Sequence, residues 1–141
     1  MDVPYVALIQ QHKALKRELL AAAGEVLDSG QFILGAKVAE FEKRIAKLCG
    51  SKFAIGVNSG TDALILSLQA LGIGPGDEVI TAPNSFLASA SCAVDVGAKP
   101  VFADVAGDLN IDPVKIEEAI TPKTKAVIPV HLTGRPAQMD R

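Results

Sequence analysis

A run of small and polar residues carries the strongest chemical signal in this chain: Asn58-Ser59-Gly60-Thr61-Asp62-Ala63-Leu64. It follows a short apolar segment, Phe53–Val57, that predicts a strand, and it opens an apolar stretch that predicts a helix. A turn of this kind leaves free backbone N–H groups at the positive end of the helix dipole, where phosphate groups bind. Gly60 lets a ligand approach the backbone closely, and Thr61 adds a hydroxyl donor. The run therefore predicts a phosphate-binding turn.

The same run also fits an ordinary capped helix. Ser59 and Asp62 have the S-x-x-D spacing of a capping box, in which the serine side chain satisfies a free N–H group of the first helical turn. The residues of this run do not by themselves decide between a helix cap and an anion site.

A second candidate group follows the next predicted strand, Glu78–Ala82. There the chain reads Asn84-Ser85-Phe86, and Phe86 is expected at the start of the following helix, beside the Gly60-Thr61 turn. An exposed aromatic ring next to a phosphate-binding turn suits a planar phosphorylated ligand, because the ring can stack while the helix end holds the phosphate. The alternative is that Phe86 packs in the core, which is the commoner place for a phenylalanine.

Composition excludes several classes of function. Of 141 residues, 49% are hydrophobic and 21% charged, and the net charge of −2 comes without long Lys/Arg runs, so neither nucleic acid nor an acidic membrane is expected as a partner. No apolar run approaches the roughly 20 residues that span a bilayer. The N-terminus lacks the pattern of a signal peptide, and a cytoplasmic location follows as the expectation. Cys49 and Cys92 are expected as buried free thiols, and no metal-ligand spacing occurs.

Hydrophobic spacing predicts the elements that position these residues. Two amphipathic helices come first, at about 10–28 and 38–49, and apolar strands then alternate with helices. The expected strands are 53–57, 78–82, 99–103 and 126–130; the expected helices between them are 61–71, 86–96 and 113–120. Asp112-Pro113 is a typical helix start.

This alternation predicts an α/β fold with three αβα layers and a mainly parallel sheet, since the strands are apolar on both faces. Ligands of such sheets collect where strands end and helices begin. Those places are 58–62, 83–86, 104–108 and 131–135. No internal linker divides residues 1–141, so one domain is expected. Its last residues read as the start of another helix, which predicts a truncated chain or a fragment.

Several ordered stretches resemble the DegT/DnrJ/EryC1/StrS aminotransferases over essentially the whole chain. Those stretches are Ser29–Gly35, Phe41-Glu42, Asn58–Leu64, Leu71–Ile80, Asn84–Phe86, Gly97–Phe102, Ile111–Pro113, Thr121–Ala126 and Pro129–Leu132. The resemblance implies the N-terminal portion of the large domain of a fold-type I enzyme that uses pyridoxal 5′-phosphate (PLP). It further implies a nucleotide-linked keto-sugar as substrate, an amino-acid donor, commonly glutamate, and a homodimer.

The resemblance also implies site residues. Gly60, Thr61 and Asp62 would hold the cofactor phosphate, Phe86 would stack on the pyridine ring, and Ser59 is a weaker candidate for the same pocket. A carboxylate is repelled by a phosphate, so we expect Asp62 to cap the helix and to contribute only its backbone N–H. Two further residues, Tyr5 and Phe32, match the region where the family builds its substrate site.

One departure from the family is decisive for catalysis. Transamination needs a lysine that holds the cofactor and a carboxylate on the pyridine nitrogen. In the family both follow the segment that matches 131–140, and this chain ends at Arg141, so no catalytic residue is assigned. The ten lysines present fit helix surfaces and turns, and Asp104 is interpreted as a loop or capping residue. The 141 residues alone are therefore expected to be inactive. The alternative function is a non-catalytic fragment that binds phosphate or PLP, or that forms an interaction surface.

Overall fold

The computed structural model describes residues 3–141. The chain separates into two compact units, the first ending at Gly56 and the second running from Val57 to Arg141. The sequence predicts that residues 1–141 form a single incomplete domain. Whether the two units belong to one domain stays a prediction. Within residues 3–141, no helix combines the length and the apolar character that crossing a bilayer would require.

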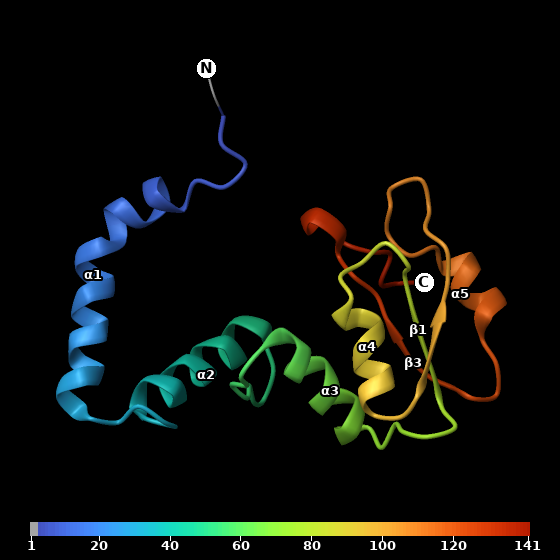
Figure 1. The fold of residues 1–141 in the computed structure, drawn as a ribbon, viewed down its shortest axis with the longest axis horizontal. Coiled ribbons are helices and arrows are strands. Elements are labelled where there is room, and N and C mark those ends of the chain that lie inside the picture. Colours follow the sequence, from blue (N-terminus) through green and yellow to red (C-terminus); the bar gives the residue numbers. More distant parts are fainter. Residues whose placement is uncertain (1–2) are drawn as a thin grey trace. The chain divides into compact units, whose positions relative to one another are not determined.

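The first unit consists of two helices, α1 (Leu8–Ser29) and α2 (Ala36–Cys49) (Figure 1). Both predicted helices are thus confirmed. Each ends at a glycine in the left-handed conformation, Gly30 with φ of 66° and Gly50 with φ of 64°, because glycine adopts this conformation without a Cβ clash. Both cysteines are free, but only Cys92 is buried; the prediction that Cys49 is buried is wrong, since it lies exposed at the end of α2.

The segment after α2 is not the strand that its apolar residues predict. Residues 53–57 have irregular backbone, and Phe53 and Ile55 are exposed. The segment is held to α2 by the Gly56 N–H group, which donates to the Glu42 carboxylate at 2.7 Å. A strand exists only where a neighbour completes its hydrogen bonds, and none of the described strands pairs with this segment. Residues 53–57 therefore have the composition of a strand but no neighbouring strand to pair with among the described residues.

The second unit contains a three-stranded parallel sheet in the order β2-β1-β3. Its elements in chain order are α3 (Gly60–Ala70), β1 (Glu78–Thr81), α4 (Ala88–Asp95), β2 (Lys99–Phe102), α5 (Pro113–Ala119), β3 (Thr124–Ile128) and the short 3-10 turn η1 (Leu132–Gly134). These strands and helices match the predicted alternation, although β3 begins two residues earlier than expected. The Asp112 carboxylate caps α5 by accepting from the Val114 N–H group at 2.9 Å, as its sequence predicts.

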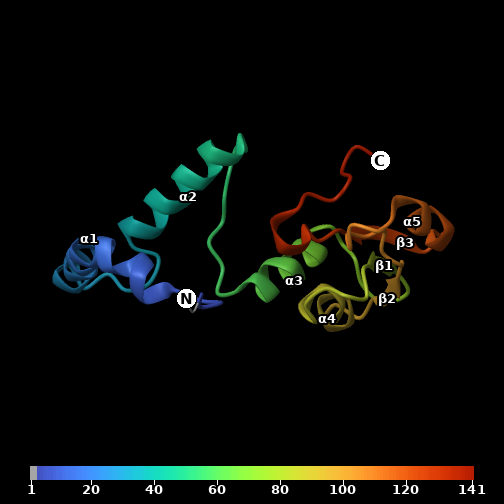
Figure 2. The same ribbon diagram turned by 90° about the horizontal axis from the view of Figure 1, so that it is seen from above.

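Helices cover both faces of the sheet, and Figure 2 shows α4 and α5 on opposite sides of it. On one face, α3 and α4 pack around Val79 and Cys92. On the other, α5 packs over Ile80 and Ala103. All four residues of the central strand β1 are buried, whereas the outer strands are partly exposed. The predicted three-layer α/β arrangement with parallel strands is confirmed in this unit.

Candidate functional site

Helices α3 and α4 pack against each other on one face of the sheet. Helix α3 returns through residues 71–77 to the first residue of β1, so its N-terminus lies toward the other, carboxyl end of that strand. Helix α4 starts after the carboxyl end of β1 and runs back to the beginning of β2. Both helices pack on the same face. Segment 83–86 therefore lies at the carboxyl edge. That segment 58–62 lies beside it stays a prediction of the α/β topology.

A real cap forms at the start of α3. The Ser59 hydroxyl oxygen accepts from the Asp62 backbone N–H at 3.0 Å and donates to the Asp62 carboxylate at 2.9 Å. The capping interpretation of this spacing is correct, but the Asp62 side chain returns to the serine hydroxyl rather than to its backbone N–H. The Asp62 N–H is consequently already used, although the sequence suggested it as a phosphate donor.

Two N–H groups remain at this helix end. Gly60 and Thr61 are the first residues of α3, and N–H groups at these positions have no intrahelical acceptor. A side chain added at Gly60 would meet no atom within 4 Å, so the space over this residue is open. The cap and an anion site are thus compatible, because the cap uses the Asp62 N–H and leaves those of Gly60 and Thr61 without an intrahelical acceptor. The positive helix end adds to the attraction for a phosphate.

Phe86 lies two residues before α4 rather than inside it, and its carbonyl accepts from the Ser89 N–H at 3.0 Å. The ring is 79% exposed, so the alternative that Phe86 packs in the core is wrong. An exposed aromatic ring at the carboxyl edge is available to a planar ligand. Its stacking on a cofactor ring stays a prediction.

The two weaker substrate candidates belong to the first unit. Tyr5 precedes α1 and Phe32 lies between α1 and α2; both side chains are exposed. Their roles in substrate binding stay predictions.

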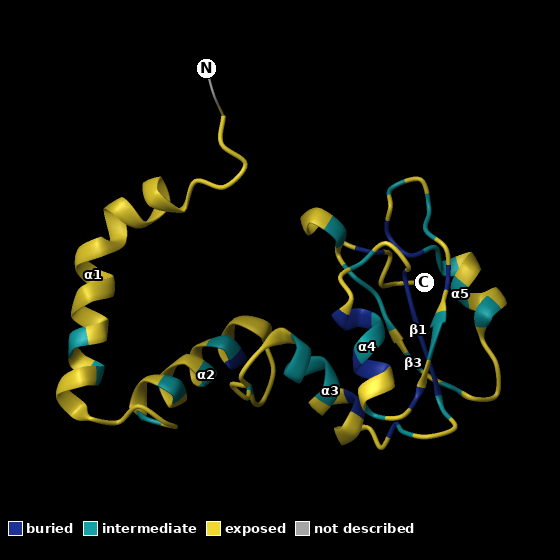
Figure 3. Cartoon of the chain, viewed as in Figure 1, coloured by how far each residue is buried: buried dark blue, intermediate teal, exposed yellow. Residues whose placement is uncertain are grey.

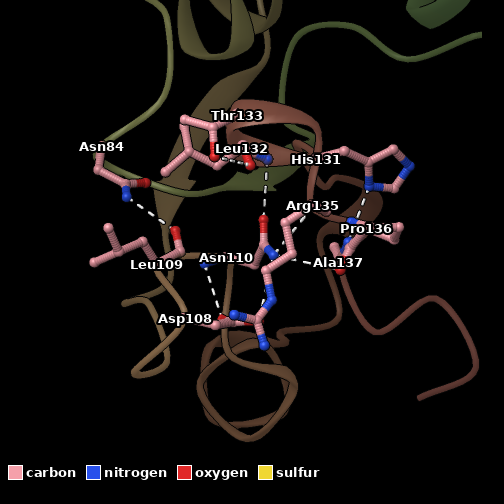
Figure 4. Close-up of polar contacts among 10 residues, drawn as sticks. All are labelled: Asn84, Asp108, Leu109, Asn110, His131, Leu132, Thr133, Arg135, Pro136 and Ala137. Atoms are coloured by element: carbon pink, nitrogen blue, oxygen red, sulfur yellow. Dashed lines mark hydrogen bonds and ion pairs between the residues drawn. The ribbon is translucent and has the colours of Figure 1, made fainter.

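The sequence did not single out a polar cluster that occupies the same edge of the sheet (Figure 4). It joins residues of three loops: Asn84, Asp108, Asn110, His131 and Arg135. The buried Asn110 stands at its centre, and its side-chain oxygen accepts from the Leu132 N–H at 3.0 Å. The sequence placed Asn84, Asp108, His131 and Arg135 at the ends of predicted strands, but it did not single out Asn110, whose partners Leu132 and Arg135 lie more than 20 residues away.

Hydrogen bonding in this cluster stabilises a carboxylate. The backbone N–H of Asn110 lowers the pKa of Asp108, and the Asn110 amide and the Arg135 guanidinium add to this lowering. The Arg135 Nε atom lies 3.3 Å from the Asp108 carboxylate. The imidazole Nδ1 of His131 accepts from the Ala137 N–H at 3.0 Å. With Nδ1 acting as an acceptor, the neutral ring carries its proton on Nε2.

Three of the four lysines of the second unit lie at the amino edge of the sheet. Lys99 pairs with Glu78 at 3.3 Å across the amino ends of β2 and β1, which is the opposite edge of the sheet. Lys123 and Lys125 stand at the start of β3, also at that edge, and Lys115 pairs with Glu118 on α5. Asp104 accepts from the N–H of the next residue at 2.8 Å, in agreement with its interpretation as a loop residue.

One pocket of the second unit lies apart from the α3 turn. A cavity of about 250 Å³ opens between α5, β3 and the C-terminal residues, and it is mostly apolar. Its lining residues are Ile111, Pro113, Ile116, Val127, Pro129, Ala137, Gln138, Met139 and Arg141. Because none of them is a candidate residue for phosphate binding, the candidate site rests on the open helix end and not on a closed pocket.

Comparison with curated proteins gives several relatives of high identity. The spore coat polysaccharide biosynthesis protein SpsC of Bacillus subtilis is 52% identical over 125 residues, which are 88% of this chain and 32% of SpsC. The dTDP-3-amino-3,4,6-trideoxy-alpha-D-glucose transaminase of Streptomyces venezuelae is 46% identical over 98% of this chain and 37% of its own length. The chain thus spans about a third of the length of these relatives.

Solved structures agree with the sequence relatives. S. venezuelae DesV matches with a TM-score of 0.94 and 46% identity over 98% of this chain and 38% of DesV. NtdA of B. subtilis, solved with bound cofactor PMP, matches with a TM-score of 0.93 and 38% identity over 99% of this chain and 32% of NtdA. The fold is therefore that of the N-terminal portion of fold-type I PLP aminotransferases.

The family model agrees with both comparisons. It describes the DegT/DnrJ/EryC1/StrS aminotransferase family and matches residues 13–141, which is most of the chain. The resemblance of the ordered motifs, from Ser29–Gly35 to Pro129–Leu132, is thereby confirmed. This chain belongs to the DegT/DnrJ/EryC1/StrS aminotransferase family.

Proposed function

We propose that this chain carries the phosphate-binding part of a PLP site, within a protein that transfers an amino group to a nucleotide-linked keto-sugar. The observation that supports this most is the open N-terminus of α3 in a family that uses PLP. There, Ser59 caps the third N–H, those of Gly60 and Thr61 have no intrahelical acceptor, and the space over the Gly60 Cα is open. A phosphate needs such donors and the helix dipole.

The residues at the carboxyl edge fit the cofactor in complementary ways. Gly60 and Thr61 would hold the phosphate, while Ser59 and Asp62 would keep the turn in shape and direct the carboxylate to the serine hydroxyl. The exposed ring of Phe86 would cover one face of the pyridine ring. When bound, PLP supplies an electron sink for breaking bonds at an amino-bearing carbon.

The substrate class is proposed from relatives. The S. venezuelae relative is named as a transaminase of a dTDP-linked sugar, and a Pseudomonas aeruginosa relative, 44% identical, is named as an aminotransferase of a UDP-linked oxo-sugar. A nucleotide-linked keto-sugar as acceptor, glutamate as donor, a homodimer and a cytoplasmic location are proposed on that basis. Tyr5 and Phe32 are proposed contributors to the sugar site.

The 141 residues alone are proposed to be inactive in transamination. Lys99, Lys123 and Lys125 stand at the starts of β2 and β3, at the amino edge of the sheet, and Lys115 is paired with Glu118. No residue described above is assigned to hold the cofactor covalently. Measurable amino transfer by this chain would contradict the proposal.

The test is a titration of the chain with PLP, followed by the absorbance of the cofactor. Gly60→Val fills the open space at the start of α3 and is expected to weaken binding by at least about tenfold. Gly24→Val is the matched control, since Gly24 is also a helical glycine with open space around it, in α1. Equal affinity of the two variants would reject the α3 turn as the phosphate site.

A second candidate function is an interaction fragment. It is favoured by the exposed apolar residues Phe53 and Ile55 and by the outer strand β3, whose Val127 is partly exposed. Unpaired apolar strand edges promote association between chains. Light scattering separates the two functions: a dilute monomer that binds PLP counts against the interaction fragment.

A further inference from the structure

Three loops leave the carboxyl edge of the sheet, one after each strand. They are residues 82–87 after β1, 103–112 after β2 and 129–137 after β3. Because the order is β2-β1-β3, the chain from β2 to β3 must cross the central strand. Figure 1 shows the middle loop rising beyond the end of β1. This loop is the element that can contact both of the others.

The middle loop, residues 103–112, is held in shape by backbone contacts within it. Val105 and Ile111 form an antiparallel bridge, and the Ala106 N–H donates to the Asn110 carbonyl at 2.9 Å. Leu109 has a φ of 69°, a left-handed conformation that a leucine adopts only where surrounding contacts impose it. The tip of the loop is therefore fixed in one shape and presents its polar groups in defined directions.

Side-chain amides tie this loop to its two neighbours (Figure 4). On one side, the Asn84 Nδ2 atom donates to the Leu109 carbonyl at 3.0 Å. On the other, the Asn110 Oδ1 atom accepts from the Leu132 N–H at 3.0 Å. The Nδ2 atom of Asn110 also donates to the carbonyls of Arg135 and Pro136, at 3.3 and 3.4 Å.

The two amides differ in setting but act on the same loop. Asn110 is only 3% exposed and uses its oxygen and its nitrogen toward the third loop, so its loss would remove three hydrogen bonds to backbone groups of that loop. Asn84 is exposed and lies two residues before Phe86, in the first loop. The hydroxyl of Ser85, the residue between Asn84 and Phe86, donates to the Ala82 carbonyl at 3.1 Å. This hydrogen bond limits the conformational freedom of the segment that leads to Phe86.

We propose that Asn84 and Asn110 are positioning residues: together they brace the three carboxyl-edge loops and thereby fix the ring of Phe86 where a cofactor can meet it. This role rests on the proposed function, since Phe86 is the group that would contact PLP. Neither amide needs to touch the cofactor. Their effect passes through the loop 103–112, so their contributions to cofactor affinity are coupled.

The test compares Asn84→Ala, Asn110→Ala and the double variant in the 141-residue chain. Gln138→Ala is the control, because Gln138 is an exposed residue that directly follows the third loop. Amide hydrogen exchange at Leu132, measured by NMR without cofactor, reports the brace itself. The PLP dissociation constant, measured by absorbance, reports its consequence for the site.

Loss of one hydrogen bond is expected to change these quantities by about fivefold. Asn110→Ala should speed exchange at Leu132 by at least that factor, and each single variant should raise the PLP Kd by about fivefold. The double variant should raise Kd by less than the product of the two single effects, which independent sites would give. Gln138→Ala should match the wild type in both measurements.

Unchanged Kd values in both single variants, with wild-type PLP binding intact, would overturn the positioning role and leave the proposed function standing. Multiplicative effects in the double variant would overturn the shared brace. Absence of saturable PLP binding to the wild type would instead overturn the proposed function, and this role with it. If Asn110→Ala does not fold, the exposed Asn84→Ala decides through its Kd alone.

Discussion

Helix α1 and strand β1 differ in what they bury. Helix α1 is 22 residues long and has no buried residue, whereas all four residues of β1 are buried between helices (Figure 3). Both segments are rich in apolar residues, so composition does not separate them. The difference is that β1 has a strand on each side and helices on both faces. Stability and site geometry are therefore expected to reside in the second unit.

The largest expected effect comes from a substitution in the core of the second unit, compared with one on the surface of α1. Ile80→Ala removes a fully buried side chain of β1 and should lower the free energy of unfolding by about 3 kcal/mol. Leu20→Ala in α1 removes a side chain that is 63% exposed and should change it by less than about 0.5 kcal/mol. Urea unfolding followed through the NMR signals of β1 measures both. Equal losses would mean that α1 contributes a core of its own.

A smaller effect concerns the cap that shapes the phosphate-binding turn. Ser59→Ala removes the acceptor of the Asp62 N–H and should destabilise the second unit by about 1 kcal/mol. Ser67→Ala on the same helix is the control; its hydroxyl donates only to the Ala63 carbonyl one turn earlier, so little change is expected. Thermal unfolding by circular dichroism measures the pair. A neutral Ser59→Ala would show that the cap does not hold the start of α3.

The smallest expected effect is a difference in acid sensitivity. The Thr121 hydroxyl, at 2.6 Å, lowers the pKa of Glu78, and Lys99 adds to this. A lowered folded-state pKa stabilises the fold above the ordinary glutamate value, about 4.3, and this stability is lost as the pH falls from there toward the folded-state pKa. Glu78→Gln should therefore flatten the acid dependence of the melting temperature of the second unit.

The first unit supplies the control for that pH series. A hydrogen bond and ion pair with Lys37 lower the pKa of Glu25, but both side chains are more than half exposed, so solvent weakens the pair. Glu25→Gln should leave the acid dependence of the second unit as in the wild type. The reverse ranking of the two variants would place the acid-sensitive contacts outside the sheet.

Sequence patterns predicted what local physics determines. Helical spacing and end signals such as Gly30 and Asp112 gave the helices, because caps and periodicity act within a few residues. The order of strands and helices in the second unit followed from the same signals. The cap at Ser59 was also readable, since its partner lies three residues away.

What depended on distant partners was not predictable. Residues 53–57 have the composition of a strand, but pairing depends on a neighbour that no local pattern specifies. The role of Asn110 depends on the strand order β2-β1-β3, which brings Leu132 to it from 22 residues away.

The most direct test of the account is an NMR titration of the 141-residue chain with PLP. If the phosphate binds at the start of α3, the amide signals of Gly60 and Thr61 should shift most, followed by those around Phe86, with α1 and α2 unaffected. Shifts confined to the first unit, or to the amino edge of the sheet near Lys99 and Lys123, would contradict the assignment of the phosphate site to the start of α3.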